Sequence, residues 1–315
     1  MSAVVTMRDQ GAATTLELLR EDPRAALVLA EISTDRFARA LAEFPDRAVN
    51  VGIMEATMVG VAAGLAMEGF HPIVHTIAPF LTERPFEQLK LDFGYQGLGG
   101  TLLGTGASYD YATEGATHHG TGDVGVLLTI PGAEVLVPGH AAELDTLLRA
   151  TYADGRLTYV RGGAATNERP MPVAPGSLHV VRRGAGPTLV AVGPMLDRTV
   201  AAAEGVDATI AYTASVAPFD LEGLAAVAGD RPHVVTVEPF YEGTLAATVT
   251  AALRHVPARF DAIGVPRRFP SAYGTAAEHD RDNGLDTAGI RARLEALFAE
   301  ARGRTSTTPS STRTS

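Results

Sequence analysis

The sequence has no cysteine, which excludes disulfides, thiolate metal ligands and a cysteine nucleophile. Its first residues, MSAVVTMRDQGAATT, lack a basic segment followed by an apolar core, so we expect no secretory leader. No apolar run reaches the roughly 18 residues of a membrane-spanning helix. Together these absences predict a soluble cytoplasmic protein.

Basic side chains are also few relative to acidic ones. The 315 residues include 26 Lys and Arg against 36 Asp and Glu, a formal net charge of −10, and no basic patch of the kind that nucleic-acid binding needs is visible. Hydrophobic residues make up 46%, which is enough for a sizeable core. At about 100–200 residues per domain, the length suggests two domains.

Short apolar runs alternate with longer helical patterns, which is typical of βαβ units on a parallel sheet. In the first half, the expected strands are 26–30, 48–52, 73–76, 101–103 and 157–160, and the expected helices are 14–21, 54–68, 83–95 and 141–152. The helix at 54–68 has the clearest pattern. Its apolar residues Met54, Met58, Val61 and Leu65 repeat at helical spacing, and Gly69 follows as a C-cap.

The stretch NERPMPVAPGS at 167–177 has three prolines and marks a linker. Beyond it, the expected strands are 188–192, 208–212, 233–237 and 263–266, and the expected helices are 195–203, 221–229, 245–255 and 288–299. The last residues are nearly all Ser, Thr, Arg, Pro and Gly, a composition typical of disorder. We therefore predict two α/β domains, 1–166 and 178–301, each a mainly parallel sheet flanked by helices, and a disordered tail at 302–315.

Three segments of the first domain contain the residue types that chemistry needs. Glu55 lies where a strand gives way to a helix, and by itself it reads equally well as a solvated helix-start carboxylate. Phe80, Arg84 and Phe86 lie in or beside a strand-to-helix turn, where phenylalanine is usually core. Each segment alone is therefore a weak signal.

The third segment, EGATHHGTGD at 114–123, places two adjacent histidines in an expected loop. Loops on a rigid α/β scaffold often carry function. Adjacent side chains point apart in an extended chain, so we do not expect His118 and His119 to share a metal. Either histidine alone could equally be a solvated loop residue.

Taken together, the three segments resemble the pyrimidine-binding domain of transketolases and deoxyxylulose-phosphate synthases. NVGIMEATMVGVAAGLAMEG is similar to the family stretch in which a glutamate follows Gly-Ile-x, and GATHHG resembles its Gly-x-Thr-His-Gln loop. TIAPFL matches a strand end that carries an aromatic ring. More loosely, TLVAVG at 188–193 and HVVTVE at 233–238 resemble the transketolase C-terminal domain.

This resemblance implies a thiamine-diphosphate enzyme and a role for several residues beside its pyrimidine. Glu55 matches the glutamate that hydrogen-bonds N1′ of the aminopyrimidine, so a buried Glu55 would support the hypothesis and a solvated one would oppose it. Phe80 matches the ring that stacks on the pyrimidine. We expect Ile53 and Phe86 to lie beside the same cofactor.

The resemblance also implies a set of substrate-binding residues. His118 matches the catalytic histidine that faces the substrate, and Arg161 matches an arginine that meets a substrate phosphate. Glu114 stands where the family more often has Asp, and His119 replaces the usual Gln. Arg84 has no secure counterpart in the transketolases proper.

One family feature is missing. The Mg²⁺ that holds the diphosphate is bound in the family through a Gly-Asp-Gly motif, and this sequence has only TGDV at 121–124. The chain is also about half as long as a full transketolase. We therefore expect no metal ligands in this chain, and a diphosphate-binding partner subunit of the transketolase N-terminal type that supplies them in an α2β2 assembly.

Four functions remain open at this point. The favoured one is a transketolase-type transferase that moves a two-carbon ketol unit between phosphorylated sugars. A 2-oxo acid dehydrogenase β-type subunit would have a loop closer to Gln-His-Ser, and a deoxyxylulose-phosphate-synthase-like enzyme would condense its donor with a carbonyl acceptor. A non-catalytic subunit is the last possibility, and the joint presence of Glu55, Phe80 and His118 argues against it.

Overall fold

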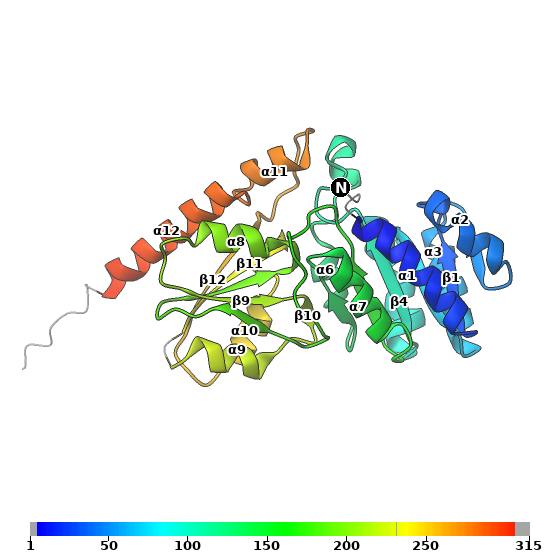
Figure 1. The fold of residues 1–315 in the computed structure, drawn as a ribbon, viewed down its shortest axis with the longest axis horizontal. Helices are drawn as coiled ribbons and strands as arrows, with labels where there is room; N and C mark the ends of the chain where they lie inside the picture. The colour runs from blue at the N-terminus through cyan, green and yellow to red at the C-terminus, as the bar shows by residue number, and fades with distance from the viewer. Residues whose placement is uncertain (1–4, 231, 306–315) are drawn as a thin grey trace, which may run out of the picture.

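The computed structural model describes residues 5–230 and 232–305, and the side chains of its last helix up to residue 300 (Figure 1). The chain forms two mixed, mainly parallel sheets, each flanked by helices. This architecture confirms the predicted fold class. Within the described residues, no helix is long and apolar enough to cross a membrane.

The first sheet has seven strands in the order β10-β5-β6-β4-β3-β1-β2. Six of them are parallel: β1 (Ala25–Leu29), β2 (Ala48–Asn50), β3 (His71–Ile77), β4 (Gly100–Thr105), β5 (Glu134–Leu136) and β6 (Leu157–Arg161). Every residue of β1, β4 and β6 is buried, as expected for strands covered on both faces. β1 (AALVL) is a continuous apolar run, and β4 and β6 each contain a shorter apolar segment that the sequence predicted.

The helical elements of the first half connect these strands. They are α1 (Met7–Glu21), α2 (Thr34–Glu43), α3 (Glu55–Met67), α4 (Ala78–Thr82), α5 (Phe86–Gln88), the π-helical η1 (Leu89–Tyr95), the 3₁₀ segment η2 (Ala112–Thr117), α6 (Asp123–Leu127) and α7 (Ala141–Thr151). The single helix predicted at 83–95 is wrong in detail, because Pro85 separates α4 from α5 and the rest is π-helical.

The second sheet has the order β12-β11-β8-β9-β7. Its strands are β7 (His179–Arg182), β8 (Thr188–Val192), β9 (Thr209–Thr213), β11 (His233–Tyr241) and β12 (Arg259–Val265), and only β7 runs antiparallel to its neighbour. Its helices are η3 (Gly193–Met195), α8 (Leu196–Ala202), α9 (Leu221–Ala228), α10 (Ala246–Ala252), α11 (Ala276–Asp282) and α12 (Thr287–Thr305). Figure 1 shows α8 and α12 on one face of this sheet and α9 and α10 on the other.

One strand joins the two halves of the chain. β10 (Ser215–Ala217) follows β9, yet it pairs antiparallel with β5 at the edge of the first sheet. The Val137 amide next to β5 donates to the Ala214 carbonyl at 2.7 Å. The second half of the chain therefore completes the first sheet, an arrangement the sequence did not predict.

The chain end differs from the prediction in one respect. Residues 302–305 of the predicted tail belong to α12, so the helix continues beyond the expected boundary. Residues 306–315 lie outside the described residues. No helix or strand occupies the predicted linker at 167–177.

Candidate active site

Glu55 is the first residue of α3, directly after the turn that follows β2. Gly52 makes this turn at φ +78°, a backbone conformation that side chains other than glycine rarely adopt. The Glu55 side chain is only 3% exposed. Glu55 is therefore buried and not solvated, which is the condition that the resemblance sets for it.

The Glu55 carboxylate has one occupied oxygen. Arg84 Nη1 donates to Glu55 Oε1 at 2.7 Å, and no hydrogen bond from a described residue reaches Oε2. The Arg84 side chain is 46% exposed, so it approaches the buried carboxylate from the surface. Glu55 therefore keeps one oxygen for a further donor.

An aromatic ring lies on the other side of Arg84. Phe80 is in α4, immediately after β3, and its ring centroid is 3.9 Å from the guanidinium carbon of Arg84. This is a cation–π contact. Arg84 thus joins the Glu55 carboxylate and the Phe80 ring, two residues that come from different strand ends.

His118 packs against the same ring. Its imidazole centroid lies 4.9 Å from that of Phe80, edge to face at 68°, and a hydrogen bond of 3.0 Å joins its Nδ1 to Thr117 Oγ1. His118 caps the C-terminus of η2, so this segment is partly 3₁₀ helix and not the loop we predicted. Gly115 has φ +74° there, and a Cβ on it would meet the Tyr273 ring at 2.8 Å. A residue of the second half thus covers this segment.

Ile53 and Phe86, predicted beside the cofactor, and Glu114, predicted as a substrate residue, are not in this cluster. Ile53 is 72% exposed, Phe86 is half-buried against the core, and Glu114 is exposed. Their predicted roles remain predictions, because no described hydrogen bond or ion pair joins them to Glu55.

His119 points away from His118, as expected for neighbouring side chains. It is buried, and its ring lies 5.2 Å from that of His279 in α11 and 6.4 Å from that of Tyr109. Neither of its ring nitrogens has a hydrogen-bond partner in the described part of the chain. Burial lowers the pKa of His119, with smaller contributions from His279 and His118.

Arg161, at the end of β6, is buried and already holds several partners. Its Nε donates to Asp123 Oδ2 at 2.7 Å, and its Nη2 donates to Ser108 Oγ and the Gly120 carbonyl at 3.1 and 3.0 Å. Arg161 therefore binds residues on both sides of His118 in the chain, Ser108 before it and Gly120 after it. The sequence contained Asp123 in TGDV, but nothing in the local pattern identified it as the partner of Arg161.

Glu238 is a buried carboxyl that the sequence analysis did not single out. It lies in β11, accepts hydrogen bonds from Thr236 Oγ1 at 2.6 Å and the Thr244 amide at 3.0 Å, and burial raises its pKa to about 7. The same strand contacts the segment around His118, because the Tyr241 amide donates to the Thr121 carbonyl at 3.0 Å. The only sequence signal at this position was the HVVTVE stretch, which ends at Glu238.

These residues fit the aminopyrimidine half of a thiamine diphosphate molecule better than its diphosphate half. Glu55 Oε2, the Phe80 ring and His118 offer an acceptor, a flat apolar surface and an imidazole to a ring. Among the described residues, no group of three or more His, Asp or Glu side chains could hold a metal ion.

Comparisons with known proteins give the same two-part division of the chain. The model of the transketolase pyrimidine-binding domain matches residues 4–162, and that of the transketolase C-terminal domain matches residues 176–290. A protein described as an uncharacterized 33.6 kDa protein in the fasciation locus of Rhodococcoides fascians is 43% identical over 276 residues, 86% of this chain and 88% of that protein.

Two further relatives have named activities. One of the subunits of the apulose-4-phosphate transketolase of Actinobacillus succinogenes is 32% identical over 65% of this chain and 69% of its own length. The 1-deoxy-D-xylulose-5-phosphate synthase of Chlorobium luteolum is 31% identical over 90% of this chain, which spans only 47% of that enzyme.

Among solved structures, a split-gene transketolase described as an inactive β4 tetramer superposes with a TM-score of 0.80. It is 26% identical, and the match covers 93% of this chain and 98% of the other. With both family models matched in order and this split-gene chain matched over nearly its full length, the chain belongs to the transketolase family and carries its pyrimidine-binding and C-terminal domains.

Proposed function

We propose that this chain is one subunit of a thiamine-diphosphate-dependent transketolase that transfers a two-carbon ketol unit between phosphorylated sugars. The observation that carries the proposal is the buried Glu55 at the start of α3, with one free oxygen and with Phe80 and His118 nearby. The family match supports dependence on thiamine diphosphate.

Glu55 would face the aminopyrimidine of the cofactor. When bound, the cofactor supplies a nucleophilic thiazolium carbon that adds to a sugar carbonyl. Glu55 Oε2 would share a proton with the pyrimidine nitrogen N1′, and burial keeps water from competing for that proton. A neighbouring cation opposes the sharing of a proton by a carboxylate. We therefore propose that the half-exposed Arg84 breaks its ion pair with Glu55 when the cofactor and the partner subunit are bound.

Phe80 and His118 would orient the reactants. Phe80 offers an aromatic surface to the pyrimidine. His118, held against this ring and by Thr117, would hydrogen-bond sugar hydroxyls or move protons between them.

We keep Glu114, His119, Arg84 and Arg161 as predicted substrate residues, with Ile53 and Phe86 beside the cofactor. For Arg161, positioning of the His118 segment is the role its hydrogen bonds support most directly.

A partner subunit would complete the site by holding the diphosphate and Mg²⁺. The start and exposed side of α3 and the neighbouring η1 support this. They present large apolar side chains to solvent: Ile53 and Met54 just before α3, Val61 and Met67 in α3, and Leu91 and Tyr95 in η1. Apolar patches of this kind mark protein interfaces. The match to a split-gene transketolase that is inactive as a β4 tetramer also supports the need for a second subunit, and we propose an α2β2 assembly in the cytoplasm.

The sugar substrate would carry an anionic group. Relatives are named for apulose-4-phosphate and for 6-deoxy-6-sulfo-D-fructose, sugars that end in a phosphate and a sulfonate. These names support the class of substrate that the resemblance predicted.

Calorimetry tests the proposal directly. We expect thiamine diphosphate with Mg²⁺ to bind tightly only to a mixture of this chain and a partner that contains the Gly-Asp-Gly motif. Ketol transfer should then be measurable in the mixture and absent from each chain alone. Tight binding to this chain by itself would refute the shared site.

The second candidate is condensation of the deoxyxylulose-phosphate-synthase type, favoured by the 31% identity to that enzyme over 90% of this chain. The two reactions differ in their donor. Release of CO₂ from a 2-oxo acid, in the assembled enzyme with an aldehyde acceptor, would support condensation. Transfer from a ketose phosphate without CO₂ release would support the transketolase.

A further inference from the structure

The segment that carries His118, residues 108–121, is closed at its base by a narrow neck. There the Ser108 amide donates to the Gly120 carbonyl at 3.3 Å, and the Gly120 amide donates to the Ser108 carbonyl at 2.7 Å. Ser108 has φ +54°, a left-handed backbone conformation that is unfavourable for a residue with a side chain. Such a conformation persists only where surrounding contacts hold it, so the neck depends on its neighbours.

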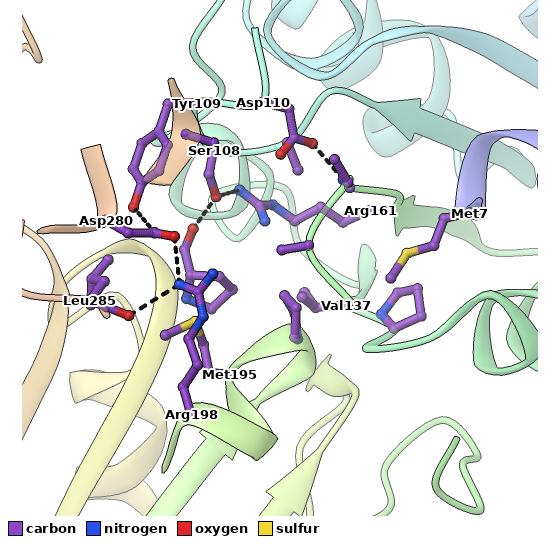
Figure 2. Close-up of a pocket in the computed structure, with 18 of the residues that line it drawn as sticks. Met7, Ser108, Tyr109, Asp110, Val137, Arg161, Met195, Arg198, Asp280 and Leu285 are labelled. Atoms are coloured by element: carbon purple, nitrogen blue, oxygen red, sulfur yellow. Dashed lines mark hydrogen bonds and ion pairs between the residues drawn. The ribbon is translucent and has the colours of Figure 1, made fainter. Parts of the chain in front are cut away.

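The end of β11, in the second half of the chain, is bonded to both sides of this neck. Ser108 Oγ donates to the Pro239 carbonyl on one side, and the Tyr241 amide donates to the Thr121 carbonyl at 3.0 Å on the other. Figure 2 shows Ser108 at the wall of the cavity between the two halves, where its hydroxyl also accepts from Arg161. The second half of the chain therefore holds the segment where its two ends meet.

Regular strand pairing does not fix this end of β11. The strand pairs with β8 and β12 up to Val237, and its register with β12 then shifts before Tyr241. Pro239 and Phe240 lie in this irregular part. Glu238, the first residue after the regular part, is fully buried. Its side chain is therefore placed to determine the shape of the turn that follows.

The Glu238 carboxylate joins the two ends of that turn, residues 239–243. Its Oε1 accepts from Thr236 Oγ1 at 2.6 Å and from the Leu245 amide at 3.4 Å, and its Oε2 accepts from the Thr244 amide at 3.0 Å. Glu238 lies before the turn, whereas Thr244 and Leu245 lie after it. Because a buried amide that loses its acceptor is costly, these bonds stabilise the turn in one conformation.

We propose that Glu238 is a positioning residue of the active site: its carboxylate fixes the turn 239–243, and this turn holds the His118 segment in place. The role in catalysis rests on the proposed function of His118, whereas the link between Glu238 and the segment does not. Glu55 and Phe80, the residues that would face the cofactor, follow β2 and β3 of the first sheet. Glu238 should therefore affect substrate turnover and leave cofactor affinity unchanged.

Hydrogen exchange of the full chain tests the link. Glu238→Met keeps the length of the side chain and removes both acceptors, so amides of 108–121 and 239–245 should exchange at least tenfold faster than in wild type. Glu238→Gln keeps one acceptor and should restore most of the protection. Glu242→Met, in the same turn but at a carboxylate paired with Arg293, is the matched control and should leave 108–121 unchanged. Wild-type exchange at 108–121 in Glu238→Met would overturn the proposal.

Ketol transfer by the assembled enzyme tests the catalytic consequence. We expect kcat/KM for the ketose phosphate, per bound thiamine diphosphate, to fall at least tenfold in Glu238→Met and to recover in Glu238→Gln, with the Kd of the cofactor within twofold of that of wild type. A role in stability alone would lower the melting temperature and leave kcat/KM of the occupied sites unchanged, which would remove Glu238 from the site. An inactive wild-type assembly would count against the proposed function, and exchange would still decide whether Glu238 holds the segment.

Thr236→Val keeps the test decisive if Glu238→Met fails to fold. It removes the hydroxyl that donates to Glu238 Oε1 and nearly preserves the shape of the buried side chain. Exchange at 108–121 should then be at least threefold faster than in wild type. Equal exchange in Thr236→Val and wild type would contradict the inference.

Discussion

Glu55 illustrates how a single residue acquires its properties from its surroundings. A glutamate in the first turn of a helix is ordinarily solvated, but this one is only 3% exposed and meets Arg84 at 2.7 Å. That ion pair offsets part of the energetic cost of burying the carboxylate. The second oxygen, Glu55 Oε2, accepts no hydrogen bond from a described residue, so it is available to share a proton with a bound ring nitrogen.

Substitution Glu55→Gln removes the carboxylate and keeps its shape. We expect the turnover of the assembled enzyme to fall at least about 100-fold, the scale of general acid–base catalysis, with assembly intact. Steady-state rates and size-exclusion chromatography of the two-subunit mixture measure both effects. The matched control is Glu68→Gln, at the exposed end of the same helix. A Glu55→Gln enzyme with full activity would remove Glu55 from the site.

His75 makes the stability of the protein depend on pH. It is buried in β3, hydrogen-bonded to Ser33 Oγ and the Leu103 carbonyl at 2.8 Å each, and burial lowers its pKa to about 4. The unfolded chain takes up a proton near pH 6.5, whereas the folded chain does not until about pH 4. The contribution of His75 to stability is therefore complete above pH 6.5 and is lost as the pH falls toward 4.

Urea unfolding at pH 7 and pH 5 measures this contribution. Between these values, wild type should lose about 2 kcal/mol more of its unfolding free energy than His75→Gln, which has no ring to titrate. His255→Gln, at an exposed histidine, should keep the wild-type pH dependence. Equal slopes for wild type and His75→Gln would contradict the prediction.

At the scale of one element, α3 is apolar on two faces. Met58 and Val59 are fully buried against the sheet, whereas Met54 and Val61 are 54% and 37% exposed. The helical spacing of Met54, Met58, Val61 and Leu65 predicted the helix correctly, but not which of these side chains the chain itself covers. We attribute the uncovered face to the proposed partner subunit.

Val61→Glu places a charge on this face. We expect the chain to fold normally and to bind its partner at least tenfold more weakly, because a charge buried in an interface without a counter-ion is costly. Val200→Glu, on α8 at a closely matched 36% exposure, is the control and should bind normally. Calorimetric titration with the partner distinguishes them, and equal affinities would place the interface elsewhere.

The sequence predicted most of the longer strands, but it missed the ten-residue helix α2 and several short strands. β8, at 188–192, has the predicted bounds, and β1, β4, β6 and β9 lie within a few residues of theirs, because buried parallel strands are continuous apolar runs. β5, β7 and β10, of three or four residues each, were missed. Short strands have little periodicity, although the three-residue β2 was predicted within 48–52, and β10 depends on a pairing with residues far away in the chain.

At the scale of the whole molecule, the two halves are interlocked. β10 forms the edge of the first sheet, and a single core cluster contains side chains from Leu27 to Ile263. His119 packs on His279, and Tyr273 covers Gly115. The second half of the chain therefore holds the segment that carries His118.

A fragment of residues 1–166 tests this dependence. Without β10, the β5 edge is unpaired and the core residues beside it face water, so we expect the fragment to aggregate or to melt without cooperativity. Light scattering and circular dichroism against the full chain provide the measurement. A monomeric fragment with a cooperative transition would show that the first sheet does not need β10.

The sequence by itself determined the alternation of strands and helices, the two α/β halves and the set of Glu55, Phe80 and His118, because each rests on neighbouring residues or on a short motif. Only the tertiary structure decided that Arg84 pairs with Glu55, that Asp123 and Arg161 form a buried pair and that β10 completes the first sheet. These features join residues that lie far apart along the chain. Burial and charge pairing arise only when the fold brings such residues together, so no local pattern encodes them.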